Sequence, residues 1–586
     1  MDTKRGIAAS PGVAVGPAYL FESEGARISR KYLMPDEVHR EIERFDKALA
    51  ASRREIGELG DKLRQKLGNG PKASDILQIH REMLEDPKLR EQVVALITNR
   101  LFTPEYAVNQ ILRRYGKPLE EAGDSYLLQR ARDFEDIEQR LLRNLLGRRR
   151  EDLGRLATPV VIVARDLAPS QTAGLDRDKV LAIATEAGGR TSHTAILARA
   201  LGIPAVVGVE GLSGQVAGGD MIVVDGAHGV VILNPDALTR RRYEALGHSR
   251  VAIEERIAAE YCNLPAVTRD GRRIGIEANI EFPQEVPGIF PHGAEGVGLY
   301  RTEFLYHTAS KPPDEEAHFQ AYMEAVQALE GRPMTIRILD LGADKFPAGF
   351  AERNPFLGCR SMRMLRLYPE IFRHQIRAIL RASAMGKIRF MFPLIATLSE
   401  LRDARRVVQE VREELDRISL AYDKTIQIGM MIEVPSAAMM ADAFAGEVDF
   451  FSIGTNDLVQ YSLAVDRGNE HVSHLYSAVD PAVLRMMRLT LEAADKAGID
   501  CSICGEMAGD ILNTILLVGM GFRKLSMTPN AIPDIKKLVR SISYEDAQRV
   551  AEQALALTSA GEIETLLAKE TRQVIPELLD EDEATA

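Results

Sequence analysis

The chain has 586 residues, a formal net charge of −11 and a hydrophobic content of 45%. Because one core rarely supports that length, we expect about two to four domains. The acidic balance argues against general nucleic-acid binding, which relies on a basic surface. No apolar stretch of about 18 residues and no signal-peptide core is apparent, so the sequence predicts no membrane insertion and a cytoplasmic location.

Extended and helical segments come first along the chain. Residues 1–22 are rich in Gly, Ala, Val and Pro and are expected to be extended. After Pro35, apolar residues recur at helical spacings and predict a long amphipathic helix. These residues are Val38, Ile42, Phe45, Leu49, Ile56, Leu59 and Leu63. Pro87 and Pro104 stand near the starts of further helices, and residues 23–147 as a whole are predicted to be helical.

A small β/α domain is expected next. Short apolar runs, punctuated by glycine and aspartate clusters, are typical of strands. They are Val160–Val163, Val180–Ala184, Ala205–Val209, Met221–Asp225 and Val230–Leu233. With the helix that follows His193, these runs predict a domain over residues 148–235. Residues 1–22 are expected to join it, which makes 23–147 an insertion. A charged helix over residues 236–262 is expected to link this domain to the rest of the chain.

The last large segment, residues 263–574, alternates strand and helix patterns. Its strand candidates are Arg273–Asn279, Gly296–Tyr300, Thr335–Leu339, Ile388–Pro393, Ile426–Ile432, Val448–Ile453, Ile499–Ile503 and Lys524–Met527. Eight such repeats are the pattern of a (β/α)8 TIM barrel, whose active site lies at the C-terminal ends of the strands. An open doubly wound sheet is the alternative. An acidic tail, residues 575–586, follows the barrel.

His193 falls in the first turn of a short predicted helix that Gly202 and Pro204 end. The free N–H groups and the positive dipole end at that place favour an anion. A neutral imidazole there could take up a phosphate and find it already stabilised. The alternative is a histidine that hydrogen-bonds its own loop near the helix cap, so other parts of the chain have to decide between the two interpretations.

Charged residues follow several predicted barrel strands, and the fold would bring them to one face. They comprise four arginines, a lysine, two carboxylates and a thiol, namely Arg301, Arg337, Arg360, Arg467, Lys345, Glu433, Asp457 and Cys504. Guanidinium groups bind phosphate and carboxylate bidentately. Mg²⁺ prefers one or two protein carboxylates, which Glu433 and Asp457 supply. Each residue alone could serve in a structural ion pair, but together they predict a small, phosphorylated substrate that carries a carboxylate.

The cysteines indicate no scaffold of disulfides or zinc. Four cysteines are too few for a disulfide framework in a chain of this length. Cys501 and Cys504 form a C-x-x-C pair, but no second pair accompanies it and no histidine follows in zinc-finger spacing. The Gly505-Glu506 stretch after the pair is more typical of an active-site loop than of a redox motif.

Six motifs, in order, resemble those of the phosphoenolpyruvate–protein phosphotransferases, the enzyme I family of the bacterial phosphotransferase system. They are Gly188-Gly-Arg-Thr-Ser-His193, Gly298-Leu-Tyr-Arg-Thr-Glu-Phe304, Arg337-Ile-Leu-Asp340, Gly429-Met-Met-Ile-Glu-Val-Pro435, Gly454-Thr-Asn-Asp-Leu458 and Cys504-Gly-Glu-Met-Ala508. The similarity runs from Gly6 almost to the end of the chain. It implies a multidomain α/β fold: a swivelling β/α phosphohistidine domain with an all-helical insertion, a linker helix and a C-terminal TIM barrel.

The resemblance also implies a role for each matching residue. His193 corresponds to the phosphorylated nucleophile, and Cys504 to the acid that protonates the enolate to give pyruvate. The phosphoenolpyruvate ligands correspond to Arg301, Arg337, Arg360, Asn456 and Arg467, and we place Lys345 with them. Glu433 and Asp457 correspond to the Mg²⁺ ligands. The helical insertion resembles the docking site for the histidine phosphocarrier HPr, the barrel resembles the half that forms a homodimer, and the linker helix is expected to act as a hinge.

The main expectation is therefore transfer of a phosphoryl group from phosphoenolpyruvate to His193 and on to HPr, the first step of sugar uptake by this system. Two related interpretations stay open. A regulatory, nitrogen-type phosphorelay would use the same chemistry with another downstream partner. A phosphoenolpyruvate synthase or pyruvate phosphate dikinase would share the histidine domain and barrel but also carry an ATP-binding domain.

Overall fold

The structure is a computed structural model, and it divides into two compact units, Met1–Arg250 and Val251–Ala586, which we describe separately. The described residues are 2–10, 12–21, 32–67, 83–84, 86–121, 134, 137–138, 140–142, 144–145, 156, 158–167, 179–189, 194–195, 198, 202–307, 312–342, 354–467, 469, 472 and 475–579. Among the helices in these ranges, none is both long enough and apolar enough to cross a membrane.

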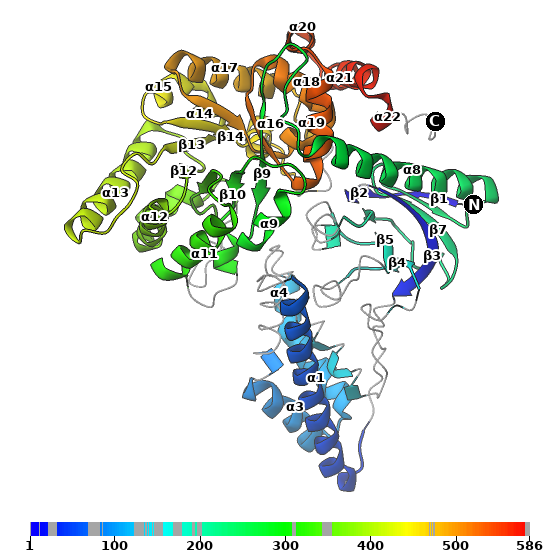
Figure 1. The fold of residues 1–586 in the computed structure, drawn as a ribbon. Coiled ribbons are helices and arrows are strands. Elements are labelled where there is room, and N and C mark those ends of the chain that lie inside the picture. Colours follow the sequence, from blue (N-terminus) through cyan, green and yellow to red (C-terminus); the bar gives the residue numbers. More distant parts are fainter. Residues whose placement is uncertain are drawn as a thin grey trace. The chain divides into compact units, whose positions relative to one another are not determined.

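The first unit contains a mixed sheet of parallel and antiparallel strands (Figure 1). In the described residues its order is β1-β8-β7-β3-β4-β5-β6-β2. The strands are β1 (Asp2–Arg5), β2 (Ile7–Ser10), β3 (Val13–Phe21), β4 (Val160–Ala164), β5 (Val180–Thr185), β6 (Ala205–Val207), β7 (Met221–Asp225) and β8 (Val230–Leu233). The near-continuous burial of β4 and β5 reflects apolar cores on both faces of the sheet. The expected strands of this domain are present, and the N-terminal segment joins them.

A helical segment interrupts this sheet between two neighbouring strands. β3 pairs in parallel with β4, so the chain leaves the sheet after Phe21 and returns at Val160. The described helices in between are α1 (Val38–Leu67), α3 (Pro87–Arg100) and α4 (Pro104–Glu121). Proline opens α3 and α4, as the sequence predicts, because its missing N–H is unpaired at that position anyway. The buried stripe of α1 packs with α3 and α4 in one core, which also contains Leu33, Leu84, Ile137, Leu141, Leu142 and Leu145.

Helix α8 (Ala237–Tyr261) lies where the linker helix is expected, and it spans the boundary between the two units. Its first turns belong to the sheet unit, because Tyr243 is buried against Val223, Val230 and Ile232.

The second unit is a closed barrel of parallel strands. They are β9 (Gly275–Ile280), β10 (Val297–Tyr300), β11 (Met334–Arg337), β12 (Ile388–Phe392), β13 (Ile428–Ile432), β14 (Phe450–Ile453), β15 (Asp500–Ile503) and β16 (Lys524–Met527). Each corresponds to a strand predicted from the sequence. β16 pairs with β9, from Lys524 opposite Gly275 to Met527 opposite Ala278, and this pairing closes the barrel. The TIM barrel prediction is confirmed, and the open doubly wound sheet is wrong.

Helices cover the outside of the barrel (Figure 1). They are α9 (Val286–Ile289), α10 (Phe304–His307), α11 (Glu315–Ala328), α12 (Pro369–Ser383), α13 (Leu398–Arg417), α14 (Pro435–Met439), α15 (Ala441–Ala445), α16 (Thr455–Leu463), α17 (Pro481–Ala497), α18 (Ile511–Met520), α19 (Ile532–Ser541), α20 (Tyr544–Ala556), α21 (Ala560–Val574) and α22 (Pro576–Leu579). One large apolar core joins these helices to the strands. Inside the barrel, a smaller cluster of Leu299, Met391, Met431, Phe450 and Cys504 fills the interior, which leaves the strand ends for polar groups.

The contact between α18 and α20 tests this packing. Gly519 of α18 lies so close to α20 that an added Cβ would sit 1.9 Å from the carbonyl oxygen of Ala547. Because that neighbour is backbone, Gly519→Ala should lower the free energy of unfolding by roughly 1–3 kcal/mol. Gly288→Ala is the matched control, since Gly288 of α9 has open space around it, and it should raise stability by about 0.4–1 kcal/mol. Calorimetry of the barrel transition checks both, and equal effects at the two sites would contradict this packing.

Candidate active site

Functional side chains gather at the C-terminal ends of the barrel strands. Arg301 directly follows β10, and Arg337 is the last residue of β11. Glu433 directly follows β13, Cys504 directly follows β15, and Asp457 lies in the first turn of α16 after β14. Parallel strands in a closed barrel end at the same face, so the fold brings these residues to one mouth.

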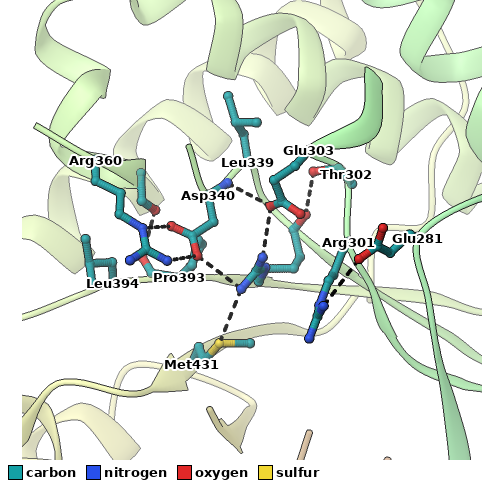
Figure 2. Close-up of polar contacts among 12 residues, drawn as sticks. Glu281, Arg301, Thr302, Glu303, Leu339, Asp340, Arg360, Pro393, Leu394 and Met431 are labelled. Atoms are coloured by element: carbon teal, nitrogen blue, oxygen red, sulfur yellow. Dashed lines mark hydrogen bonds and ion pairs between the residues drawn. The ribbon is translucent and has the colours of Figure 1, made fainter. Parts of the chain in front are cut away.

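Asp340 is the centre of this mouth (Figure 2). Arg360 donates to it bidentately, from Nε to Oδ1 and from Nη2 to Oδ2, both at 2.8 Å. Nη2 of Arg360 also lies 2.9 Å from Oδ2 of Asp457. Arg337 approaches from the other side, with Nη1 3.1 Å from Asp340 Oδ2 and Nη2 3.0 Å from Glu303 Oε1. Two guanidinium groups and three carboxylates thus form one network, in which Asp340 and Asp457 are buried and the other side chains are largely buried.

Three buried acidic residues could hold a divalent cation. One oxygen of each of Asp340, Glu433 and Asp457 lies within 4.8 Å of the others. Glu433 Oε1 accepts from the backbone N–H of Leu394 at 2.6 Å. Oδ1 of Asp457 is buried, and none of the described residues offers it a hydrogen bond. Carboxylate oxygens in this arrangement are the ligands that Mg²⁺ prefers, so the residues fit the metal that the sequence predicts.

The electrostatics of the cluster also favour a cation. Burial, with the neighbouring carboxylates of Asp457 and Asp340, raises the pKa of Glu433 well above its usual range. Burial opposes the charge of Arg360, but Asp340 and Asp457 outweigh that cost and raise the pKa of the guanidinium. The arginines therefore stay charged, while the carboxylates repel one another. A bound cation would relieve that repulsion.

Two further arginines at the mouth are held more loosely. Nη1 of Arg301 lies 3.4 Å from Glu281, and Nη1 of Arg467 lies 3.8 Å from Glu506. Both side chains are 36% exposed, whereas that of Arg337 is 12% exposed. Long, solvated ion pairs contribute little, so an anionic substrate can compete for these two guanidinium groups.

Asn456 joins two loops at the same mouth. Its Nδ2 donates to Glu506 Oε1 at 3.1 Å, and its Oδ1 accepts from the backbone N–H of Glu506 at 2.9 Å. This pair of hydrogen bonds ties the segment after β15 to the start of α16. Arg467 and Asn456 therefore share Glu506 as a partner.

Cys504 lies where the apolar interior of the barrel meets the polar mouth. The thiol is buried, and its Sγ lies 3.6 Å from the carbonyl oxygen of Ile453. Burial, above all, raises the pKa of Cys504 to about 11, so the thiol holds its proton at neutral pH. Cys501 belongs to the outer core instead, and both cysteines are free thiols, which agrees with the argument against a disulfide scaffold.

Two predicted site residues, His193 and Lys345, lie outside the described residues. The next residues after His193, Thr194 and Ala195, are helical and buried. The expected helix after His193 is therefore present at these positions. The roles of His193 and Lys345 stay predictions.

Asp340, Glu303 and Tyr461 received no role from the sequence. Asp340 and Glu303 stand inside the motifs that name Arg337 and Arg301, but a motif does not say which arginine a carboxylate meets. Tyr461 of α16 accepts from Nη1 of Arg360 at 3.3 Å and donates to the carbonyl oxygen of Phe356 at 2.6 Å. The sequence did offer one signal for a role of Asp340 at the site, since it is a carboxylate that directly follows a predicted strand, three residues after an arginine.

Three protein-family profiles match the chain in order. They are described as PEP-utilising enzyme, N-terminal, over residues 5–130; PEP-utilising enzyme, mobile domain, over 156–229; and PEP-utilising enzyme, PEP-binding domain, over 255–544. The last of these contains every barrel strand and the whole buried network. The first profile thus covers β2, β3 and the described helices of the insertion, the second covers β4 to β7 of the sheet, and the third covers the barrel strands.

Curated relatives match almost the entire chain. A protein of Haemophilus influenzae is 40% identical over 96% of this chain and 98% of its own length, and one of Bacillus subtilis is 39% identical over 97% and 100%. Both are named phosphoenolpyruvate-protein phosphotransferase. An NMR structure of an Enzyme I protein is 40% identical where it matches, covers 42% of this chain and 99% of its own, and has a TM-score of 0.38. The identity and coverage of the curated relatives show that the chain belongs to the phosphoenolpyruvate-protein phosphotransferase family.

Proposed function

We propose that this chain takes the phosphoryl group of phosphoenolpyruvate onto His193, releases pyruvate, and passes the group to a histidine of an HPr-type phosphocarrier. The observation that carries the proposal is the network of Arg337, Asp340 and Arg360, in which Asp340 clusters with the carboxylates of Glu433 and Asp457. Guanidinium groups bind phosphate and carboxylate oxygens, and a cation held by the carboxylates would add positive charge, so together they suit a small substrate with several negative charges. None of the described features favours a regulatory relay over sugar uptake, and the chemistry at this chain is the same in both.

In this proposal the arginines bind and orient the substrate. Arg337 and Arg360 are already fixed by Asp340, so they offer guanidinium groups in a set geometry. Arg301 and Arg467 exchange their long contacts with carboxylates for the substrate's own oxygens. Positive charge on several sides then stabilises the charge that spreads over the phosphoryl oxygens during transfer. Asn456 and Lys345 complete the proposed set of substrate ligands.

Glu433 and Asp457 are the proposed Mg²⁺ ligands, and the position of Asp340 beside them supports a third. When bound, Mg²⁺ neutralises charge on the phosphoryl group and helps to orient it. The unpartnered Oδ1 of Asp457 is the atom best suited to this role among the described residues.

Cys504 is the proposed proton donor. Transfer breaks the bond between phosphorus and the enol oxygen, whose electron pair stays with the three-carbon product as an enolate. An imidazole nitrogen of His193 forms the new bond to phosphorus. The thiol of Cys504 then gives its proton to the terminal carbon of the enolate, which yields pyruvate, and water returns a proton to the thiolate. A raised thiol pKa suits this role, because the group must arrive protonated.

The proposed division of labour follows the domains expected from the sequence. Residues 1–22 and 148–235 carry His193, the insertion 23–147 docks the phosphocarrier, and the helix over 236–262 acts as the hinge. The barrel, 263–574, binds phosphoenolpyruvate and forms a homodimer, with the acidic tail beyond it.

Exposed apolar side chains on the barrel support the proposed homodimer. Met439 and Met440 follow one another at the end of α14, and both are about half exposed or more; Leu489 is exposed on α17. α14 and α17 pack against each other, so these exposed side chains lie on neighbouring helices.

Label transfer tests the central proposal. Protein, Mg²⁺ and radiolabelled phosphoenolpyruvate without ATP should give acid-labile, base-stable label on the unmodified chain and none on His193→Ala. The omission of ATP separates this relay from a dikinase-like enzyme. Equal label on both chains would mean that another residue is phosphorylated, and absence of label without ATP would contradict the proposed reaction.

Metal binding tests the carboxylate cluster. Asp457→Asn removes a charge from the proposed ligand set, so Mn²⁺ affinity measured by electron paramagnetic resonance should fall by roughly 10–100-fold. Asp449→Asn is the control, because Asp449 precedes β14 at the opposite end and accepts from the N–H of Ile428. Equal loss in the two variants would place the metal elsewhere.

Substitution and a pH profile test the proposed role of Cys504 as proton donor. Cys504→Ala should lower pyruvate formation by roughly 100-fold or more, while Cys501→Ala, three residues earlier in the outer core, should retain it. Because the raised thiol pKa of about 11 keeps the donor protonated below pH 10, the unmodified chain should show no thiol-dependent loss of rate between pH 7 and 9. The rate of pyruvate formation measured over that pH range checks the direction of the shift in thiol pKa. A fall in rate near pH 8.5 would indicate a thiol with an ordinary pKa.

A further inference from the structure

A continuous chain of buried polar groups runs from the outer helices of the barrel to the active-site mouth. It consists of Tyr306, His318, Tyr322, Gln375 and Thr302. Of these, His318, Tyr322, Gln375 and Thr302 are completely buried. Leu, Phe or Met would fill such a place without the desolvation cost of two hydroxyls, an amide and an imidazole. A fully satisfied network in that setting usually fixes one specific arrangement.

The direction of each hydrogen bond can be assigned from its fixed end. The backbone N–H of Leu339 donates to Gln375 Oε1 at 3.0 Å, so Nε2 of Gln375 carries the two donors. They go to Tyr322 OH at 3.1 Å and to Thr302 Oγ1 at 2.9 Å. Thr302 in turn donates to the carbonyl oxygen of Arg337 at 3.0 Å. Gln375 therefore uses both of its donors, and its oxygen accepts one hydrogen bond.

The hydrogen bonds at the end of this network farther from the active site are consistent with this assignment. Tyr322 accepts from Gln375, so its own proton points to Nδ1 of His318 at 3.1 Å. Nε2 of His318 then donates to Tyr306 OH, also at 3.1 Å. Burial, with the nearby His374, lowers the pKa of His318 to about 3, which keeps this ring neutral. One tautomer satisfies every link.

At the end of the network near the active site, side chains supply the hydrogen bonds that β10 would make if it were longer. β11 is flanked by β12 and β10. On the β12 side, the N–H of Ile338 still donates to Met391 in the usual way. On the other side β10 has already ended at Tyr300. There the side chains of Gln375 and Thr302 bind the N–H of Leu339 and the carbonyl of Arg337, so they extend the ladder beyond the end of β10.

We propose that Gln375 is a positioning residue for the reaction: from helix α12 it fixes the backbone between Arg337 and Asp340, and through Thr302 it sets the register of the neighbouring segment that carries Arg301 and Glu303. It touches neither the substrate nor the proposed metal ligands. The inference rests on the proposed function for its catalytic consequence, because misplacing a guanidinium group by about 1 Å can cost phosphoryl transfer two orders of magnitude.

Four single variants, the double variant Gln375→Met with Thr302→Val, and two measurements test this proposal. Gln375→Met keeps the volume but removes three hydrogen bonds, Thr302→Val removes the relay to Arg337, and Thr302→Ser restores the hydroxyl. Ser383→Ala is the matched control on the same helix, since Ser383 is buried and binds Leu380 and the N–H of Asp423, away from the mouth. The measurements are kcat for pyruvate formation from phosphoenolpyruvate, with an excess of an HPr-type phosphocarrier as acceptor of the phosphoryl group, and hydrogen–deuterium exchange of the peptide that contains Leu339.

Gln375→Met and Thr302→Val should each lower kcat by about ten-fold or more and speed exchange at Leu339, whereas Ser383→Ala and Thr302→Ser should do neither. Because both residues act on one strand end, the double variant should fall little below Gln375→Met alone. The proposal would be overturned if the losses of kcat in the two single variants multiplied in the double variant. It would also be overturned if Gln375→Met and Thr302→Val lost no more kcat than Ser383→Ala while all three variants melted at similar temperatures.

The two measurements separate this inference from the proposed function. If the unmodified chain forms no pyruvate, the proposed function fails. In that case faster exchange at Leu339 in Gln375→Met, but not in Ser383→Ala, still supports the positioning role, and unchanged exchange overturns it.

Discussion

One buried carboxylate, shared by two guanidinium groups, holds the barrel mouth together. Asp340 binds Arg360 through both of its oxygens and meets Arg337 through one of them. Two arginines this close repel each other, and burying either alone would cost several kilocalories per mole. Asp340 therefore allows positive charge to be concentrated at the strand ends before any anion arrives. Surface ion pairs elsewhere on the barrel could be lost with far smaller consequences.

The arginines at this mouth fall into two physical classes. Arg337 and Arg360 are buried and locked, so little reorganisation is needed when charge develops beside them. Arg301 and Arg467 are partly solvated and hold only long contacts with carboxylates. The first class supplies a fixed field, and the second can follow a substrate as it enters. A barrel suits this combination, because rigid strands and adaptable loops meet along one rim.

Most of the architecture could be predicted from the sequence, because strands and helices differ in hydrophobic period and Pro87 and Pro104 mark helix starts. The strand-end rule likewise located Arg337 and Glu433. The partners could not be predicted: Glu303 follows Arg301 by two residues yet binds Arg337 of the next strand. Such pairings depend on side-chain direction between neighbouring strands, which spacing does not encode. The buried position of Gln375 could not be predicted either, because a lone glutamine in a helix pattern is typical of the solvent-exposed face.

The order of strands in the first unit also constrains how the chain is made. β1 and β3 are synthesised first, but their partners β8, β7 and β4 all follow the helical insertion. The described residues in the core of the insertion all lie between Leu33 and Leu145, so this core takes no residue from the strands that follow. On the ribosome, the first strands must therefore remain with open edges while the insertion is translated, which is the period when such edges are most exposed to aggregation. The insertion thus lengthens the time for which the edges of β1 and β3 wait for their partners.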